Sequence, residues 1–145
     1  MNMSGVTNII HFLRKMDPGG IESWLMNVLR NMDKDRFHWT FCTTSESLGI
    51  FEREICSLGA DWVTCPVNKG MRSFSKTFRS ILIQGQYDVV HSHMLLFSGW
   101  ALRIAKYAGV PVRIAHVHST TDGYEDTLKR ELWRFLKRKL IQRYC

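Results

Sequence analysis

Four of the six histidines of this 145-residue chain form two His-x-His pairs, His91 with His93 and His116 with His118. On a β-strand, a two-residue step places both side chains on the same side. Apolar runs next to the pairs lead us to expect the first pair after the fourth strand of a sheet and the second pair in the fifth. Imidazoles bind ligands, transfer protons and coordinate metals, so these pairs are the first candidates for a functional site.

Three interpretations of the histidine pairs stay open on spacing alone. His91 and His116 are typical of buried, hydrogen-bonded histidines. Four imidazoles on neighbouring strands also form a candidate zinc site, but no cluster of Asp, Glu or Cys accompanies them, so we expect no metal. Ligands of open parallel sheets bind at the carboxyl ends of the strands. This favours the third interpretation, in which His93 and His118 face a cleft and contact a substrate or transfer protons.

The segment Asp17–Glu22 (DPGGIE) is a second candidate, because it joins the first expected strand to the first expected helix. Gly19 and Gly20 allow the backbone to approach a ligand closely, and the free N–H groups at a helix N-terminus attract phosphate. A plain turn with a helix cap is an equally good interpretation. The dinucleotide-binding pattern G-x-G-x-x-G does not occur, so NAD and FAD are not indicated and we expect no cofactor.

Strand-like and helix-like patterns alternate along the chain and predict the scaffold that positions these candidates. Short apolar runs predict buried parallel strands, and apolar residues three and four apart predict amphipathic helices. We expect strands at about 7–13, 37–43, 61–65, 88–91 and 112–117, and helices at about 21–32, 50–58, 74–84, 97–108 and 125–142. This alternation indicates the α/β class, as one domain over residues 1–145 with a Rossmann-like doubly wound parallel sheet.

The last expected helix carries most of the net charge of +7 of the chain. From Lys129 onward there are seven Lys or Arg residues and one acid, Glu131, and leucines recur every four residues from Leu128 to Leu140. Segment 125–143 is therefore a candidate for peripheral contact with an anionic membrane, although packing on the sheet with a solvated basic face is the simpler interpretation. We expect no nucleic-acid partner, because no stacking aromatic residues alternate with the basic ones.

Cysteine content and hydropathy bear on the compartment. The four cysteines, Cys42, Cys56, Cys65 and Cys145, include no C-x-x-C pair and are expected to be structural thiols. No apolar stretch approaches the roughly 20 residues of a membrane-spanning helix, and the start of the chain lacks a secretion signal. We expect a cytoplasmic protein, located at the inner membrane face if segment 125–143 binds lipid. The end of the chain within or just after a helix suggests truncation of a longer polypeptide.

Three longer stretches, taken together and in order, resemble a known family. They are NIIHFLRKMDPGGIESWLMNVLRNM, SLGADWVTCPVNK and YDVVHSHMLLFSGWALRIAKYAGVPVRIAHVHST. Together they cover nearly the whole chain, and they resemble the retaining glycosyltransferases of family four, which have the GT-B fold. The similarity is strongest to bacterial members that build exopolysaccharide or capsule. The resemblance implies two Rossmann-like domains that face each other across a cleft, of which this chain is the N-terminal, acceptor-side domain.

The resemblance also implies roles for particular residues. It places the glycine pair near the donor diphosphate, and it places His118 near the transferred sugar as the catalytic residue. It implies that His93 lines the same cleft and contacts donor or acceptor, and that Ser119 and Thr120 in the next loop assist in substrate binding. The implied partners are a nucleotide-sugar donor and a glycan or lipid-linked acceptor.

A reaction and an incomplete enzyme follow from the same resemblance. In such enzymes the acceptor hydroxyl attacks on the face from which the nucleotide diphosphate leaves, so configuration is retained, and the leaving group takes the proton. The glutamate motif and basic residues that hold the donor lie in the second domain, which this chain lacks. We therefore expect no transfer by the chain alone. The alternative is a stand-alone binding module that docks to a separate catalytic subunit.

Overall fold

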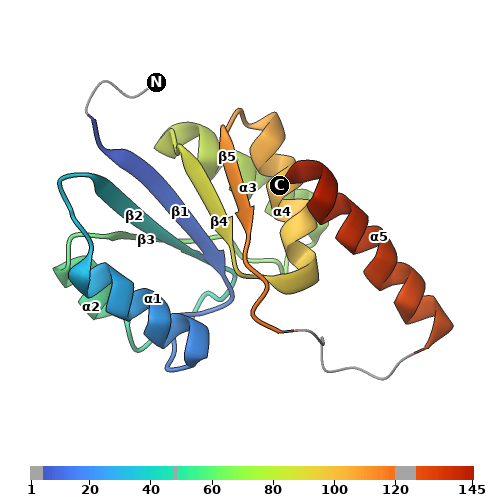
Figure 1. Cartoon of the computed structure of the whole chain (residues 1–145), viewed down its shortest axis with the longest axis horizontal. Coiled ribbons are helices and arrows are strands. Elements are labelled where there is room, and N and C mark those ends of the chain that lie inside the picture. Colours follow the sequence, from blue (N-terminus) through green and yellow to red (C-terminus); the bar gives the residue numbers. More distant parts are fainter. Residues whose placement is uncertain (1–4, 48, 120–126) are drawn as a thin grey trace.

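A computed structural model describes residues 5–47, 49–119 and 127–145 of the chain. Five strands form one fully parallel sheet in the order β3-β2-β1-β4-β5 (Figure 1). The strands are β1 Thr7–Leu13, β2 Phe37–Thr43, β3 Asp61–Thr64, β4 Val89–Ser92 and β5 Val112–Ala115. The helices are α1 Gly20–Asn31, α2 Glu52–Ser57, α3 Met71–Gly85, α4 Ser98–Tyr107 and α5 Leu128–Tyr144, with a 3-10 turn, η1, at Leu95–Phe97. The expected α/β class with a Rossmann-like parallel sheet is confirmed.

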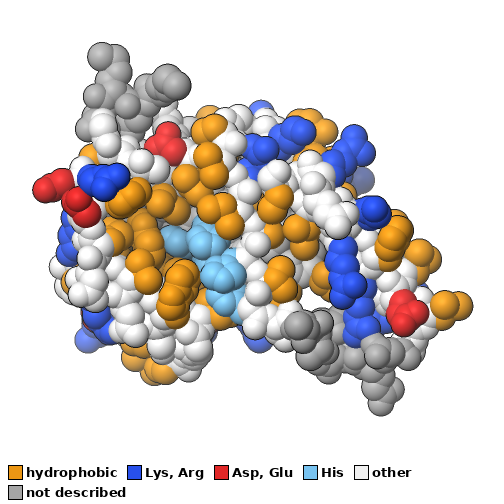
Figure 2. All heavy atoms as spheres, in the orientation of Figure 1, with side chains coloured by type: hydrophobic (Ala, Val, Ile, Leu, Met, Phe, Trp, Pro, Cys, Tyr) orange, Lys and Arg blue, Asp and Glu red, His pale blue; other side chains and the backbone are white. Residues whose placement is uncertain are grey.

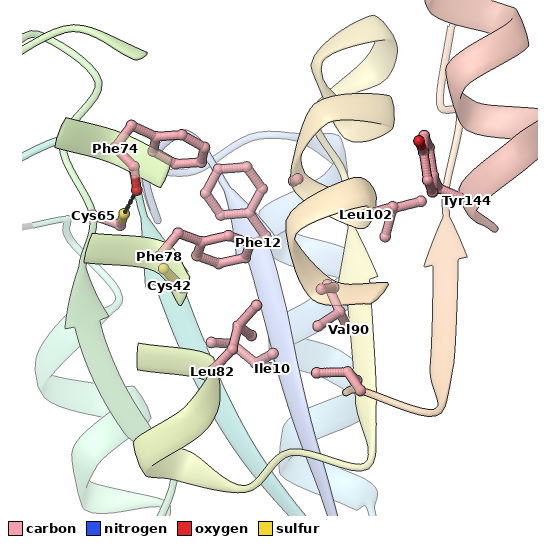
Figure 3. Packing of buried hydrophobic residues seen from close by; sticks show 13 residues of the cluster. Ile10, Phe12, Cys42, Cys65, Phe74, Phe78, Leu82, Val90, Leu102 and Tyr144 are labelled. Atoms are coloured by element: carbon pink, nitrogen blue, oxygen red, sulfur yellow. Dashed lines mark hydrogen bonds between the residues drawn. The ribbon is translucent and has the colours of Figure 1, made fainter. Parts of the chain in front are cut away.

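The alternation of side chains along the strands divides the core into two layers, one on each face of the sheet. Ile10 and Phe12 of β1 point to the face covered by α3 and α4, where Phe12 packs against Phe74 and Ile10 lies beside Leu82, both of α3 (Figure 3). Leu13 belongs to the other layer, beneath α1 and α2. His11 therefore also points to the α1 side of the sheet. The layer beneath α3 and α4 contains two buried free thiols, Cys42 and Cys65.

Helix α5 packs mainly against α4 and η1. Gly99 of α4 permits this close approach, because a Cβ atom at this position would lie 2.8 Å from Cβ of Leu140 and 3.1 Å from the backbone nitrogen of Ile141. Tyr144 is buried at the end of α5, and its carbonyl oxygen accepts a hydrogen bond of 2.7 Å from Nε of Arg113 in β5. The helix is thus anchored at its C-terminal end, and it covers α4 more than the sheet.

Strand β5 ends at Ala115 and not at residue 117, which corrects the expected position of the second histidine pair. The backbone N–H of His116 still donates a hydrogen bond of 2.8 Å to the carbonyl oxygen of Ser92. Because β4 itself ends at Ser92, β5 has no strand partner there beyond this point. His116 and His118 therefore lie in the loop after β5.

The expected helix starts are confirmed to within two residues for α1, α2 and α4, but those of α3 and α5 are wrong by three residues. Helix α5 begins at Leu128, where the hydroxyl of Thr127 accepts a hydrogen bond of 3.3 Å from the backbone N–H of Arg130. Its expected start at residue 125 lies outside the described residues. Helix α3 begins at Met71, about one turn before the expected residue 74, directly after Gly70.

The face of the sheet that carries α1 and α2 is only half covered. Within the described part of the chain, the core cluster beneath these helices includes no residue of β4 or β5. Val112 and Ile114 of β5 are 47% and 40% exposed, whereas Arg113 between them points to the opposite face. Parallel sheets normally have both faces buried. The β4–β5 half of this face is therefore available to a ligand or to another protein surface.

Candidate functional site

Five of the six histidines gather on this open face, near the carboxyl ends of β1, β4 and β5. His11 of β1 is the register partner of His91 of β4, and His93 follows two residues later. His116 and His118 come from the loop after β5. Figure 2 shows the histidine surface near the middle of the molecule, bordered by hydrophobic side chains. We call these five residues the histidine cluster.

The imidazoles of the histidine cluster contact one another at hydrogen-bond distance. Nδ1 of His11 is 3.2 Å from Nε2 of His93, and Nδ1 of His93 is 2.9 Å from Nε2 of His118. In a second contact, Nε2 of His91 is 3.2 Å from Nδ1 of His116. The ring of His93 thus connects the buried His11 to the exposed His118, so the proton positions of the three imidazoles are coupled.

Aromatic side chains surround the inner end of the cluster. His11 is 2% exposed and lies against Trp39 of β2, with 4.0 Å between the ring centroids. His93 is 5% exposed. Trp24 of α1 packs edge-on against His116, with 5.4 Å between centroids, and forms one wall of the site. Helix α1 therefore contributes a side chain to the site as well as covering the core.

Burial favours the neutral form of His11, His91 and His93, because transfer of a charged imidazole out of water is costly. Burial, together with the neighbouring histidines, lowers the pKa of His93 to about 3 and that of His91 to about 4. The pKa of His11 is also far below its ordinary value, chiefly because of burial. The pKa of His118 is lowered by partial burial and then by repulsion from His116.

Hydrogen-bond geometry assigns the protons within the cluster. Nε2 of His11 is buried without a hydrogen-bond partner among the described residues. A buried N–H without an acceptor is rarer than an unpaired acceptor, so we assign the proton of His11 to Nδ1, which donates to Nε2 of His93. His93 then donates from Nδ1 to Nε2 of His118. His118 carries its own proton on Nδ1, outside this chain of bonds, and can donate it to a ligand.

The glycine segment lies at the start of α1, the helix that carries Trp24. Gly19 is the N-cap residue of α1 and Gly20 is its first residue. The first N–H groups of a helix have no acceptor within the helix, so they are available to an anion. The carboxylate of Glu22 folds back against Gly19 and occupies the place that a Cβ atom would take there. A phosphate group at this helix end must therefore compete with Glu22.

The structure brings together some of the residues singled out from the sequence. His93 and His118 are in direct contact, and all four residues of the two His-x-His pairs belong to one cluster. Ser119 follows the cluster and is exposed. Thr120 lies outside the described residues.

Sequence analysis missed two residues of the site, His11 and Trp24. His11 stands within the apolar run of β1, and its proximity to His91 depends on strand register, which a single sequence does not reveal. Trp24 fits the apolar face of α1 but remains 43% exposed. The one signal in the sequence was that His11 is flanked by apolar residues within an expected strand.

Comparison with known proteins identifies the family. A model of the glycosyl transferase 4-like domain matches residues 19–144. The chain belongs to this family. It is 30% identical over 141 residues to EpsF of Bacillus subtilis, which is named as a glycosyltransferase, covering 95% of this chain and 37% of EpsF. It is also 30% identical over 117 residues to CapH of Staphylococcus aureus, a glycosyltransferase of capsular polysaccharide biosynthesis, covering 81% of this chain and 32% of CapH.

A solved structure shows the same fold. HepE of Anabaena, crystallised in complex with UDP, superposes on 96% of this chain and 36% of its own with a TM-score of 0.63, at 14% sequence identity. The chain spans about a third of the length of EpsF, CapH and HepE. The resemblance to bacterial glycosyltransferases of polysaccharide synthesis is confirmed.

The lowered pKa values predict that acid destabilises the fold before the carboxylates titrate. Between about pH 6.5 and 5, His11, His91 and His93 bind protons in the unfolded chain but stay unprotonated in the folded chain. As the pH is lowered, the free energy of unfolding should decrease by roughly 1.4 kcal/mol per pH unit for each additional proton that the unfolded state binds. Above pH 6.5 this contribution disappears, because both states are neutral.

Urea unfolding of the wild-type chain at pH 7.0, 6.0 and 5.0 measures this slope. We expect a shallower slope for His93→Gln. We expect an unchanged slope for Ile50→Ser, which alters an exposed residue outside the cluster that does not titrate. Equal slopes in all three proteins would contradict the assignment.

Proposed function

We propose that the chain is the N-terminal, acceptor-side domain of a GT-B glycosyltransferase. The enzyme transfers a sugar from a nucleotide-sugar donor to a glycan or lipid-linked acceptor with retention of configuration. The observation that carries the proposal is a hydrogen-bonded histidine cluster on the open face of a Rossmann-like sheet, at the edge where ligands of such sheets bind. The family, and the UDP bound by the similarly folded HepE, support a nucleotide-sugar donor.

In this proposal His118 is the catalytic residue. Its exposed ring donates an Nδ1–H to the transferred sugar, and His93 positions it through the 2.9 Å contact. Gly19 and Gly20 approach the donor diphosphate with the backbone N–H groups at the start of α1. Ser119 assists beside His118, and Thr120 keeps the same proposed role.

The proposed reaction exchanges one bond for another at the anomeric carbon of the donor sugar. The acceptor oxygen forms a bond to this carbon on the face from which the diphosphate oxygen departs. The acceptor proton passes to the departing diphosphate. Negative charge accumulates on the diphosphate, so electrostatic stabilisation there is the main requirement. The lowered pKa values of His11, His91 and His93 favour their uncharged forms, so we assign the required positive charge to the second domain of the proposed enzyme.

Helix α5 supports a lipid-linked acceptor at an anionic membrane. Five apolar side chains of its N-terminal half are more than half exposed: Leu128, Leu132, Trp133, Phe135 and Leu136. Beside them lies an open groove of about 430 Å³ lined by the basic residues Lys129, Arg130, Arg134 and Lys137. Apolar and basic side chains on one helix are typical of helices that lie in a membrane interface. In the described part of the chain, no helix is long and apolar enough to cross a bilayer.

A second candidate function is a stand-alone module that docks to a separate catalytic subunit. The observation in its favour is the exposed apolar surface of the open face, which includes Val112, Ile114 and Trp24. A second domain of the same polypeptide and a separate subunit would both cover this surface. The two candidate functions differ in what is needed for sugar transfer: a second domain in the same polypeptide for the first, and a separate subunit for the second.

We expect the chain alone to transfer no sugar, and the polypeptide extended to the length of its relatives to do so. Release of UDP from UDP-sugars in the presence of lipid-linked and oligosaccharide acceptors measures transfer. Robust turnover by residues 1–145 alone would refute the proposed incompleteness. If transfer appears only after a separate protein co-elutes with the chain in size exclusion, the docking module is the correct function.

In the extended enzyme, His118→Ala should lower kcat by roughly 100-fold, because it removes a donor positioned at the reacting sugar. His38→Ala is the matched control, since His38 lies outside the cluster and pairs with Asp61. Steady-state kinetics of the three enzymes measure the effect. An unchanged kcat for His118→Ala would remove this residue from the catalytic site.

The chain should float with vesicles that contain anionic lipid at low salt, and detach as salt rises, because the attraction is electrostatic in part. Leu128→Ser/Leu132→Ser should weaken flotation without disturbing the fold, since both side chains are exposed. Ile50→Ser, at an exposed apolar residue outside α5, is the control. No flotation of the unaltered chain at low salt would exclude membrane contact through α5.

A further inference from the structure

A groove beside α5 has the size and the lining of a site for a phosphate-containing ligand. It has a volume of about 430 Å³ and lies between α5 and the η1 turn, from which Leu96 lines it. The other described lining residues, four of them cations and none an acid, are Thr127, Lys129, Arg130, Trp133, Arg134 and Lys137. Volumes of roughly 300–1,000 Å³ are typical of sites that bind small molecules. We call this the basic groove.

The helical repeat gathers the cations on one side of α5. Arg130, Arg134 and Lys137 follow one another at steps of four and three residues, which keeps them on one helix face. Nζ of Lys137 lies 5.5 Å from the centroid of the Trp133 ring, so this ring holds an ammonium group at the groove. The positive charge of α5 is therefore concentrated around a hollow.

The neighbouring side of α5 is apolar. Leu128, Leu132 and Phe135 line a separate hollow along the helix and are each more than half exposed. Glu131, the one acid of α5, lines this second hollow. Lys129 lines both hollows, so the two adjoin. A cationic side next to an apolar side suits a ligand in which an anionic group is joined to an apolar chain.

The basic groove is built from segments that leave the same edge of the sheet as the histidine cluster. The η1 turn begins at Leu95, two residues after His93, and α5 follows the loop that begins with His116. Figure 2 shows Lys and Arg side chains over α5 on the same face of the molecule as the histidines. A ligand in the groove therefore lies on the side of the molecule from which the histidine cluster is reached.

We propose that the basic groove binds the diphosphate group of an isoprenoid-diphosphate-linked acceptor. The isoprenoid chain lies along the apolar side of α5 at Leu128 and Leu132, and the saccharide extends toward the histidine cluster. The inference rests on the proposed function, of which it names the acceptor class. It adds a saturable site, which peripheral attraction of α5 to an anionic membrane does not require.

The charge of the basic groove matches a diphosphate. Guanidinium groups bind phosphoryl oxygens through paired hydrogen bonds, and ammonium groups add compact positive charge. Arg130 and Arg134 supply the first kind of group, and Lys129 and Lys137 supply the second. Two linked phosphoryl groups concentrate more negative charge than the single phosphate of a membrane phospholipid. Four cations around one hollow therefore favour the diphosphate over a phospholipid headgroup.

The test is calorimetric titration of the chain with farnesyl diphosphate, a short isoprenoid diphosphate, and separately with inorganic diphosphate. We expect one farnesyl diphosphate per chain, bound at least about 10-fold more tightly than inorganic diphosphate because the apolar side of α5 adds contacts. Lys129→Gln/Lys137→Gln should weaken binding of farnesyl diphosphate by on the order of 10-fold or more, since two charge-assisted contacts are lost. Arg138→Gln/Lys139→Gln removes the same charge from the same helix outside the groove, and should bind as the unaltered chain does.

Circular dichroism verifies that each variant is folded. Absence of saturable binding of farnesyl diphosphate would overturn the proposal, and equal weakening by the two double variants would reduce it to attraction by net charge. Equal affinity for farnesyl and inorganic diphosphate would exclude the isoprenoid and overturn the acceptor class. If vesicles of phosphatidylglycerol bind through Lys129 and Lys137 while farnesyl diphosphate does not bind, the groove contacts the membrane surface and the proposal is wrong.

The inference and the proposed function fail in different experiments. Transfer by the extended enzyme to an oligosaccharide, without binding of farnesyl diphosphate, would keep the proposed function and overturn the inference alone. Saturable binding in the basic groove, without transfer by the extended enzyme to any acceptor, would refute the proposed function and leave the groove as an isoprenoid-diphosphate site.

Discussion

Burial of several neutral imidazoles beside one another is the constraint on which the rest of the site depends. The pKa shifts of the cluster come from burial and from the other histidines, so each added proton is repelled by its neighbours and by the apolar surroundings. A neutral imidazole has one N–H and one lone pair, so each contact in the row needs a fixed order of donor and acceptor. His11, at the buried end, sets that order. A buried residue thus determines which ring nitrogen of the exposed His118 carries its proton.

The fold produces this row through strand parity and strand termination. Ile10 and Phe12 fill the layer beneath α3 and α4, so His11 must face the other side of the sheet, toward α1. The parallel register places His91 beside His11. Because β4 and β5 are short, His93, His116 and His118 lie in the loops that follow them, at the same edge of the sheet. Helices α1 and α2 cover only the β1–β3 half of this face. The buried end of the cluster therefore packs against Trp39 and Phe41, whereas its other end, at His118, is exposed to solvent.

Sequence patterns predicted the alternation of strands and helices, the parallel sheet and the two His-x-His pairs, because periodicity within a segment reports its own environment. Contacts between segments could not be predicted from these patterns. His11 joins the cluster only through register with β4, and β5 stops at Ala115 because β4 offers no further partner. The leucine pattern of α5 predicted one continuous apolar face, yet Leu140 packs on α4 while Leu128 is exposed. Periodicity shows that a face is apolar, but a neighbouring element decides how far along the helix it is covered.

The two exposed apolar surfaces of the chain differ in charge, and this difference indicates different uses. On the open face, Val112, Ile114 and Trp24 are exposed on the same side of the sheet as the histidine cluster, and Trp24 contacts His116. On α5, apolar residues alternate with most of the excess positive charge of the chain. A diphosphate is stabilised by positive charge close to it, and the open face supplies hydrogen-bond donors without such charge. The proposed function therefore divides the work: it assigns orientation of the reacting sugar to the histidine cluster, neutralisation of the diphosphate to the partner that covers the open face, and contact with an anionic surface to the basic charge of α5.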